Sequence, residues 1–291
     1  MKLEPECIGC IFNQVLKAFR ILKPDISRDE IVKAQKKLME LILKFDEKSN
    51  TTHNLGKETY NLISNILNEE DPYLNFKQKN NKLALKYYDK IKRKIENAED
   101  PLFKAILVSA IGNTIDFASQ HEIDLISDIE NLNQENFRIN DYLLFKNSLE
   151  NTNHILIIGD NAGEIVFDKL LILTLNQLFP SLEIIYSVRS APIINDATMQ
   201  DAEFVNLTKV AQVIESNAAP GVDIDSASES FKSHFFQKGG VILSKGQGNF
   251  ESLYDIEIPT IDVYFLLKVK CNLLESIFTA QIGDLIFKKK D

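Results

Sequence analysis

The first half of the chain carries apolar residues at the three- and four-residue spacing of amphipathic helices. Ile8, Phe12, Val15, Phe19 and Leu22 follow this spacing, and similar apolar stripes recur up to about residue 150. Glycine, which destabilises helix interiors, occurs only three times in this stretch. The pattern predicts a helical domain over residues 1–150.

The pattern changes at residue 151, where short continuous apolar runs begin to alternate with helical spacing. The runs are typical of strands that are buried on both faces, and they occupy residues 154–159, 182–188, 210–214, 240–245 and 260–267. Helical spacing covers residues 164–178 and 226–237. Strands that alternate with helices form mostly parallel sheets with helices on their faces. Residues 151–291 are therefore predicted to form an α/β domain, a sheet between helices.

The loop after the first apolar run has the sequence GDNAGE, residues 159–164. It matches neither the dinucleotide-binding pattern G-x-G-x-x-G nor the Walker A loop. Asp160 and Asn161 stand side by side at the expected strand end, where ligands of parallel sheets bind. Their oxygens are of the hard type that Mg²⁺ or Mn²⁺ prefers. An alternative interpretation is that one of them only caps the following helix.

Two more polar loops are expected at the same edge of the sheet. Arg189 follows the second run and is a candidate for binding a phosphate oxygen, whereas Asp196 suits either a third metal ligand or a helix cap. Lys245 ends the fourth run, before Gly246 and Gly248, whose backbone amides can face an anion. A lysine beside glycines is expected to have few packing partners, so the fold should tolerate its loss.

Four segments together resemble the damage-control metal-phosphatase family, the ARMT-like proteins first catalogued as domain of unknown function 89. They are GDNAGEIVFDKL, VRSAPIINDATMQDA, KGQGNFESL and AIGNTIDFA. The resemblance covers nearly the whole chain and implies a helical region followed by a Rossmann-like three-layer α/β/α domain. It also implies a divalent-metal-dependent phosphatase that hydrolyses sugar phosphates or damaged phosphometabolites. A C-x-x-C such as Cys7 to Cys10 marks one subgroup of the family.

The resemblance also assigns roles to residues. It implies metal ligands at Asp160, Asn161 and Asp196, catalytic roles for Asp160 and Lys245, and substrate contacts from Asn113, Asp116, Arg189, Gly246 and Gly248. The expected cofactor is Mn²⁺, Mg²⁺, Co²⁺ or Ni²⁺. The nucleophile is either a water on the metal or Asp160 itself. Ser190 departs from the family pattern, which prefers glycine after the arginine.

Some of these polar residues also have a structural interpretation. Asn113 and Asp116 are three residues apart within an apolar helical stripe, so they either form internal hydrogen bonds or face a pocket. Glu164 and Asp168 stand at helical spacing behind the metal loop and are expected to support it. Cys271 is a possible third ligand beside Cys7 and Cys10, although thiols are often simply small apolar groups.

Charge and composition limit the classes of molecule that the protein is expected to bind. The 291 residues contain 33 basic and 42 acidic side chains, a formal charge of −9, which argues against general binding of nucleic acid. No apolar run approaches the length of a membrane span, and the N-terminus lacks a signal-peptide pattern. Three cysteines suit a reducing compartment. We therefore expect a cytoplasmic protein whose partner is a small phosphorylated metabolite, and a solvated tail at residues 288–290.

Two other classes of function remain open on the sequence. An adenosylmethionine-dependent carboxyl methyltransferase would also place a glycine-rich loop after a strand, but the acidic residue usual after the second strand is replaced by Arg189 and Ser190. A non-catalytic metabolite-binding protein is the third class. Metal-dependent release of phosphate from an ester separates the first class from both alternatives.

Overall fold

The structure is a computed structural model that describes residues 1–45, 51–112 and 136–291. The helix predicted over residues 164–178 is present with those bounds, whereas the one predicted over residues 226–237 is shorter and spans Glu229–Phe235; a short 3-10 turn spans Leu207–Lys209. The helices are α1 (Pro5–Leu22), α2 (Arg28–Lys44), α3 (Thr52–Leu67), α4 (Leu74–Glu96), α5 (Pro101–Gly112), α7 (Tyr142–Glu150), α8 (Glu164–Leu178), α9 (Met199–Phe204), α10 (Glu229–Phe235), α11 (Gln247–Leu253) and α12 (Asn272–Phe278). Among the described helices, none combines the length and apolarity needed to span a bilayer.

A seven-stranded sheet forms the centre of the molecule, in the order β1-β7-β6-β5-β2-β3-β4. All neighbouring strands are parallel except β6 and β7. The strands are β1 (Phe137–Asn140), β2 (His154–Ile158), β3 (Glu183–Val188), β4 (Gln212–Glu215), β5 (Val241–Lys245), β6 (Asp262–Lys268) and β7 (Leu285–Lys289). The predicted α/β class and mostly parallel sheet are confirmed.

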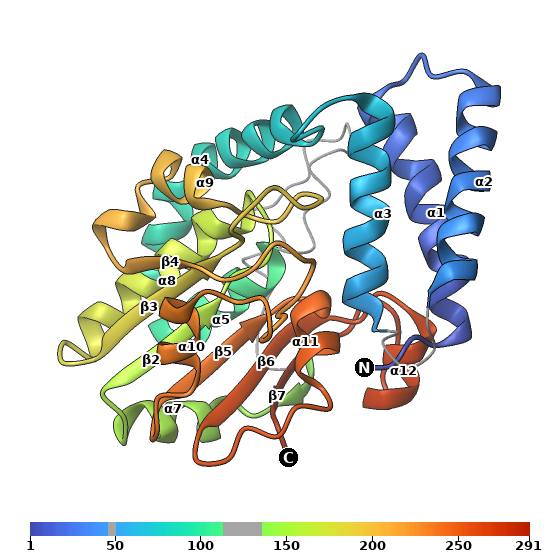
Figure 1. The fold of residues 1–291 in the computed structure, drawn as a ribbon. Coiled ribbons are helices and arrows are strands. Elements are labelled where there is room, and N and C mark those ends of the chain that lie inside the picture. Colours follow the sequence, from blue (N-terminus) through green and yellow to red (C-terminus); the bar gives the residue numbers. More distant parts are fainter. Residues whose placement is uncertain (46–50, 113–135) are drawn as a thin grey trace.

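Alternate residues of each central strand pack on opposite faces of the sheet, as the strand pleat requires. In β2, Ile155 and Ile157 contact a core that includes α4, α5, α7 and α8. Leu156 and Ile158 contact a second core, which includes α10, α11 and α12. Both faces of the sheet are thus covered by helices (Figure 1), which explains why β2 is apolar at every position.

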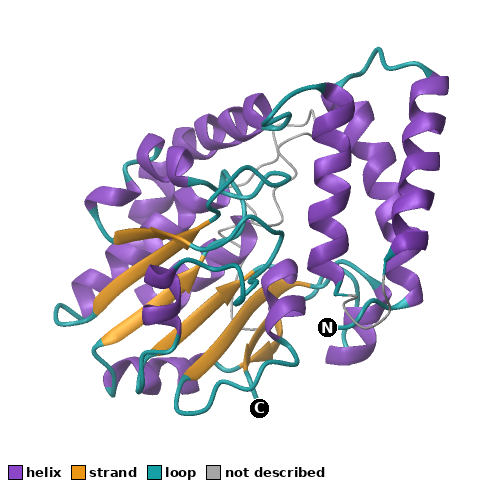
Figure 2. Ribbon diagram, in the orientation of Figure 1, coloured by secondary structure: helices purple, strands orange, loops and turns teal. Residues whose placement is uncertain are grey.

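Helices α1, α2 and α3 form a third apolar core beside the sheet, on the right of Figure 2. A capping box of Ser27 and Glu30 begins α2. Ile193, from the loop after β3, joins this third core and links it to the carboxyl ends of the strands. The first 150 residues therefore divide between two cores, because α4, α5, α7 and β1 pack with the sheet.

Two strands lie where the sequence pattern did not predict them. β1 is a four-residue strand at the edge of the sheet, and β7 contains part of the basic run that was expected to be a solvated tail. Lys289 belongs to β7 and pairs with Asp262, with 2.6 Å between the ammonium and the carboxylate. The tail prediction is therefore wrong for Lys288 and Lys289.

The order in which the chain adds strands reverses between β2 and β5: β3 and β4 lie on one side of β2, and β5, β6 and β7 lie on the other. The chain leaves β2 toward α8 on one face of the sheet and leaves β5 toward α11 on the other. The loops after these two strands therefore diverge, and such a switch point is where open α/β sheets bind ligands. This point lies at the carboxyl ends of the strands, on the side of the sheet where α3 stands (Figure 1).

At the amino ends of the strands, His154 of β2 stacks on His234 of α10, with 3.0 Å between two of their ring nitrogens. Burial lowers the pKa of His154, and His234 lowers it further. His154 therefore binds a proton less tightly in the folded protein than in the unfolded chain. The free energy of unfolding is consequently highest above the unfolded pKa of about 6.5 and falls as the pH drops below that value.

We expect His154→Gln to remove this acid sensitivity because glutamine does not titrate. Between about pH 7.5 and pH 5.5 the free energy of unfolding of the wild type should fall relative to the variant, by at most about 1.4 kcal/mol per pH unit. Urea unfolding at each pH measures both slopes. Parallel curves for the two proteins would show that His154 does not titrate differently on folding.

Candidate functional site

A cavity of about 410 Å³ lies at the carboxyl ends of the strands, between the sheet and helices α1 and α3. Its floor includes Asp160, Asn161, Asp196 and Gly248, and its helical wall includes His53. The volume is within the range of pockets for small ligands. The structure thus brings the three predicted metal ligands to one cavity.

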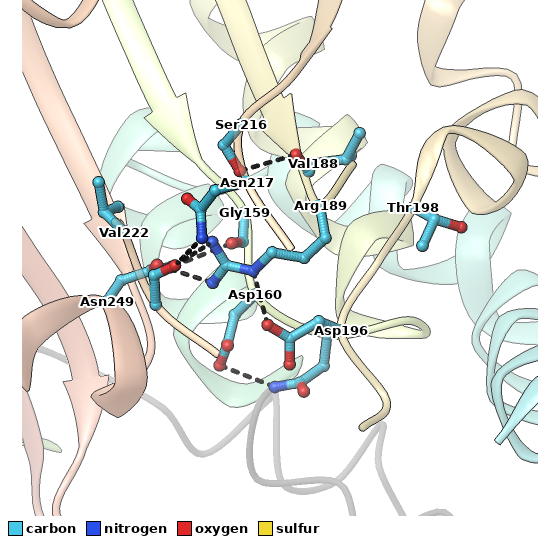
Figure 3. Close-up of polar contacts among 12 residues, drawn as sticks. Gly159, Asp160, Val188, Arg189, Asp196, Thr198, Ser216, Asn217, Val222 and Asn249 are labelled. Carbon is cyan, nitrogen blue, oxygen red and sulfur yellow. Dashed lines mark hydrogen bonds and ion pairs between the residues drawn. The ribbon is translucent and has the colours of Figure 1, made fainter. Parts of the chain in front are cut away.

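The metal-ligand candidates are held together by backbone pairing between the loops that follow β2 and β3. Asn161 and Asp196 form an antiparallel bridge. The Ala197 amide donates to the Asp160 carbonyl at 2.8 Å, and the Ala162 amide donates to the Asn195 carbonyl at 2.9 Å. Because the two segments are paired, the Asp160 and Asp196 side chains have a fixed relation to one another (Figure 3).

The structure does not support the capping interpretation for these residues. Gly163 is the N-cap of α8, with no side-chain cap, so neither Asp160 nor Asn161 caps that helix. The N-cap of α9 is Thr198, in a capping box with Asp201. Asp196 therefore lies two residues before the cap, and its carboxylate serves another purpose.

Gly246 is required by the position of Asp160. Its φ of 80° lies in the left-handed region, and an added Cβ atom would collide with the Asp160 carboxylate. The glycine thus lets the carboxylate lie directly against the backbone between β5 and α11. Gly248 contributes to the cavity lining, whereas Gly246 lies behind Asp160.

The side chain of Arg189 is buried and holds Asp196 in place (Figure 3). Its Nε donates to Asp196 Oδ2 at 2.7 Å, one terminal nitrogen donates to the Gly221 carbonyl at 3.0 Å, and the other to Asn249 Oδ1 at 2.8 Å. Asn249 in turn donates to the Gly159 and Lys245 carbonyls. All three guanidinium nitrogens therefore contact protein, and the predicted contact with phosphate stays a prediction.

Lys245, the last residue of β5, is fully buried. Its ammonium pairs with Glu164 and Asp168 and donates to the Ser109 carbonyl at 3.1 Å. Although burial opposes it, these carboxylates raise the pKa of Lys245. The expectation that this lysine has few packing partners is wrong, because α5 and α8 enclose the end of β5. Its predicted catalytic role stays a prediction.

The acids of the cavity have the character of a cation site. Asp160 and Asp196 are 9 % and 6 % exposed. Burial raises the pKa of Asp196 to about 6, and the nearby Asp160 carboxylate adds to the rise although Arg189 opposes it. Two buried carboxylates, Asp160 and Asp196, with the Asn161 amide nitrogen 2.7 Å from Asp160, form a donor set that fits a hard divalent cation.

Two further sets of residues were singled out in the sequence. Asn113 and Asp116 fall outside the described residues. Cys7, Cys10 and Cys271 are free thiols that line the same cavity. Within the described ranges, however, no three His, Cys, Asp or Glu side chains are grouped as metal ligands.

Several residues of the site were not predicted from the sequence. Asn249, which holds Arg189, lies in the KGQGN segment, in the first turn of α11, so an asparagine in the glycine-rich segment after β5 was an available signal. The cavity wall formed by Gln14 and His53 had no such signal. These two residues come from α1 and α3, more than 100 residues before the loop that follows β2, and only the fold brings them near it.

Comparison with known proteins places the chain in a family. Residues 3–286 match the family model of the damage-control phosphatase ARMT1-like domain. The chain belongs to this family. A damage-control phosphatase of Pyrococcus horikoshii is 32 % identical over 98 % of this chain and 97 % of its own length. A damage-control phosphatase of Archaeoglobus fulgidus is 27 % identical over 99 % of both.

The structural comparison extends the likeness to the whole fold. The crystal structure of a DUF89 family protein from Pyrococcus horikoshii matches with a TM-score of 0.89 and 29 % identity, and each chain is covered completely. An uncharacterised protein of Methanocaldococcus jannaschii is 33 % identical over 100 % of this chain and 96 % of its own. The family resemblance found in the sequence is therefore confirmed, and so is the fold class.

Proposed function

We propose that this damage-control phosphatase family member is a divalent-metal-dependent phosphatase that hydrolyses small phosphate esters, such as sugar phosphates or damaged phosphometabolites. The observation that carries the proposal is the pair of buried carboxylates, Asp160 and Asp196, which two paired strand-end loops hold at one end of a cavity. The names of the two curated phosphatase relatives support it.

Asp160, Asn161 and Asp196 would hold the cation, for which Mn²⁺, Mg²⁺, Co²⁺ and Ni²⁺ are the candidates. A divalent cation there would polarise the phosphoryl oxygens and lower the pKa of an attacking water. Arg189 fixes the orientation of Asp196 through its 2.7 Å contact. Gly248 lines the cavity without a side chain, which supports close approach of a phosphoryl group to the backbone.

The lining of the cavity also suits a phosphate ester with a small organic group. Its helical wall contains the apolar side chains of Ile11 and Leu55 and the polar side chains of Gln14 and His53. A mixed wall of this kind suits the carbon skeleton and hydroxyl groups of a phosphorylated metabolite. The residues of α1 and α3 would therefore select among alcohols, whereas the strand-end loops act on the phosphate.

Phosphate release from p-nitrophenyl phosphate tests the proposal. The protein is stripped with a chelator and then assayed alone and with each of the four cations. We expect release only after a cation is restored. Full activity in the stripped protein would refute the metal dependence. No release with any cation, for this ester or for a panel of sugar phosphates, would refute the phosphatase and favour the methyltransferase or binding alternatives.

A further inference from the structure

Helix α4 carries polar side chains that are as deeply buried as its apolar ones. Lys77 and Asn81 are each 1 % exposed, one helical turn apart. The Lys77 ammonium lies 2.7 Å from Asp71 and 3.6 Å from Asp201. A polar cluster this deep costs free energy unless every group is paired, so its partners indicate what it does.

The partners of Asn81 are the two segments that carry the candidate metal ligands. Its Oδ1 accepts a hydrogen bond from the Gly163 amide at 2.6 Å, in the turn that follows Asp160 and Asn161. Its Nδ2 donates to Asp201 Oδ1 at 2.8 Å, in the helix that follows Asp196. One amide group therefore bridges the loop after β2 and the segment after β3.

The chain of hydrogen bonds continues toward Asp196 through the other carboxylate oxygen of Asp201. Asp201 Oδ2 accepts from the Thr198 amide at 3.0 Å and from the Thr198 hydroxyl at 2.9 Å. Thr198 stands two residues after Asp196, and its backbone also pairs with that of Arg189. A shift of Asn81 or Asp201 would thus move the backbone on which Asp196 is carried.

We propose that Asn81 is a positioning residue, which locks the two ligand-bearing segments in register and thereby sets the affinity of the divalent cation. This inference rests on the proposed function, because it assumes a cation on Asp160, Asn161 and Asp196. Asn81 contacts none of these side chains in the described hydrogen bonds. It acts through Gly163 on one segment and through Asp201 on the other.

The side chain has the right chemistry for a bridge of this kind. An amide offers a carbonyl oxygen and an NH₂ group at the same time, and here the two face a backbone amide and a carboxylate. Leucine has a similar volume and neither function, so Asn81→Leu would leave the Gly163 amide and the Asp201 carboxylate without this partner. Groups that orient metal ligands typically contribute about 10- to 100-fold to metal affinity.

Manganese titration tests the inference independently of turnover. Free Mn²⁺ gives an electron paramagnetic resonance signal that is lost on binding, so a titration yields the dissociation constant of the protein with the metal alone. We expect Asn81→Leu to raise that constant by about 10- to 100-fold. Asn81→Ser, whose shorter side chain cannot span both partners, is measured instead if the leucine variant does not fold.

Ser148→Ala is the matched control for a general loss of stability. Ser148 is buried and bonds Asp262 and Tyr264, near the amino end of β6, at the edge of the sheet opposite the cavity. Both variants should melt at a lower temperature, but only the Asn81 variant should lose Mn²⁺ affinity. Unchanged affinity in the Asn81 variant, with normal binding by the wild type, overturns the inference. If the wild type binds none of Mn²⁺, Mg²⁺, Co²⁺ and Ni²⁺, the proposed function is overturned instead.

Discussion

Asp196→Asn is expected to weaken Mn²⁺ binding strongly and to reduce phosphatase turnover by about two to three orders of magnitude. The substitution keeps the shape of the side chain and an oxygen that can accept from Arg189, but it removes one of the two carboxylate charges that face the cavity. The loss of charge also removes the cost of burying a charge, which is the main reason that the pKa of Asp196 is raised, and it relieves the repulsion with Asp160, which adds to that rise. The substitution should therefore lower the affinity for the cation and leave the stability of the fold unchanged.

Calorimetric titration with Mn²⁺ and a melting curve of the metal-free protein separate the two effects. Asp89→Asn, which makes the same change on an exposed face of α4, is the control and should behave as the wild type. If Asp196→Asn binds Mn²⁺ and turns over as the wild type does, Asp196 is not a metal ligand. If it simply unfolds, the Arg189–Asp196 pair is structural.

Lys245→Ala is expected to have the largest effect on stability. The ammonium is fully buried between Glu164 and Asp168, so its removal leaves two carboxylates together without a cation. Breaking a buried ion pair in this way typically lowers the free energy of unfolding by about 3–5 kcal/mol. Chemical denaturation of the variant and the wild type measures the difference.

A compensated variant shows whether the loss comes from the stranded charges. When Lys245→Ala is combined with Glu164→Gln and Asp168→Asn, no uncompensated charge remains, and much of the stability should return. A single Lys245→Ala variant as stable as the wild type would show that the cluster contributes little. The catalytic role predicted for Lys245 is tested by turnover of the compensated variant, which should then fall with the fold intact.

The sequence predicted the central strands because their burial leaves a strong signal. β2 is covered on both faces, so its residues form a continuous apolar run, and the same holds for most of β3, β5 and β6. β1 and β7 gave no such signal. β1 has four residues with mixed burial, and β7 ends in lysines that remain partly exposed at the strand end.

The floor of the site was predictable for a related reason. Asp160 and Asp196 follow two neighbouring parallel strands, so their loops had to meet at one edge of the sheet. The surroundings of Arg189 and Lys245 were not predictable, because their partners come from distant segments such as Gly221, Asn249, Ser109 and Glu164. A local motif identifies a charged residue, but whether it faces the ligand depends on tertiary contacts.

Asn81 illustrates the same limit more sharply. It follows Asn80 in a lysine-rich stretch of α4, where neither asparagine belongs to a recognisable motif. Only the packing of α4 against α8 and α9 brings its amide to Gly163 and Asp201. A residue that orients a site through other residues can therefore be recognised only from the tertiary structure.

The location of the bound cation tests the central claim most directly. Crystals grown with Mn²⁺ and measured at the manganese absorption edge give an anomalous difference map in which the ion appears without reference to any model of the site. The account predicts a peak in contact with side-chain oxygens of Asp160, Asn161 and Asp196. A peak only elsewhere, or none in a protein whose phosphate release requires Mn²⁺, would contradict it.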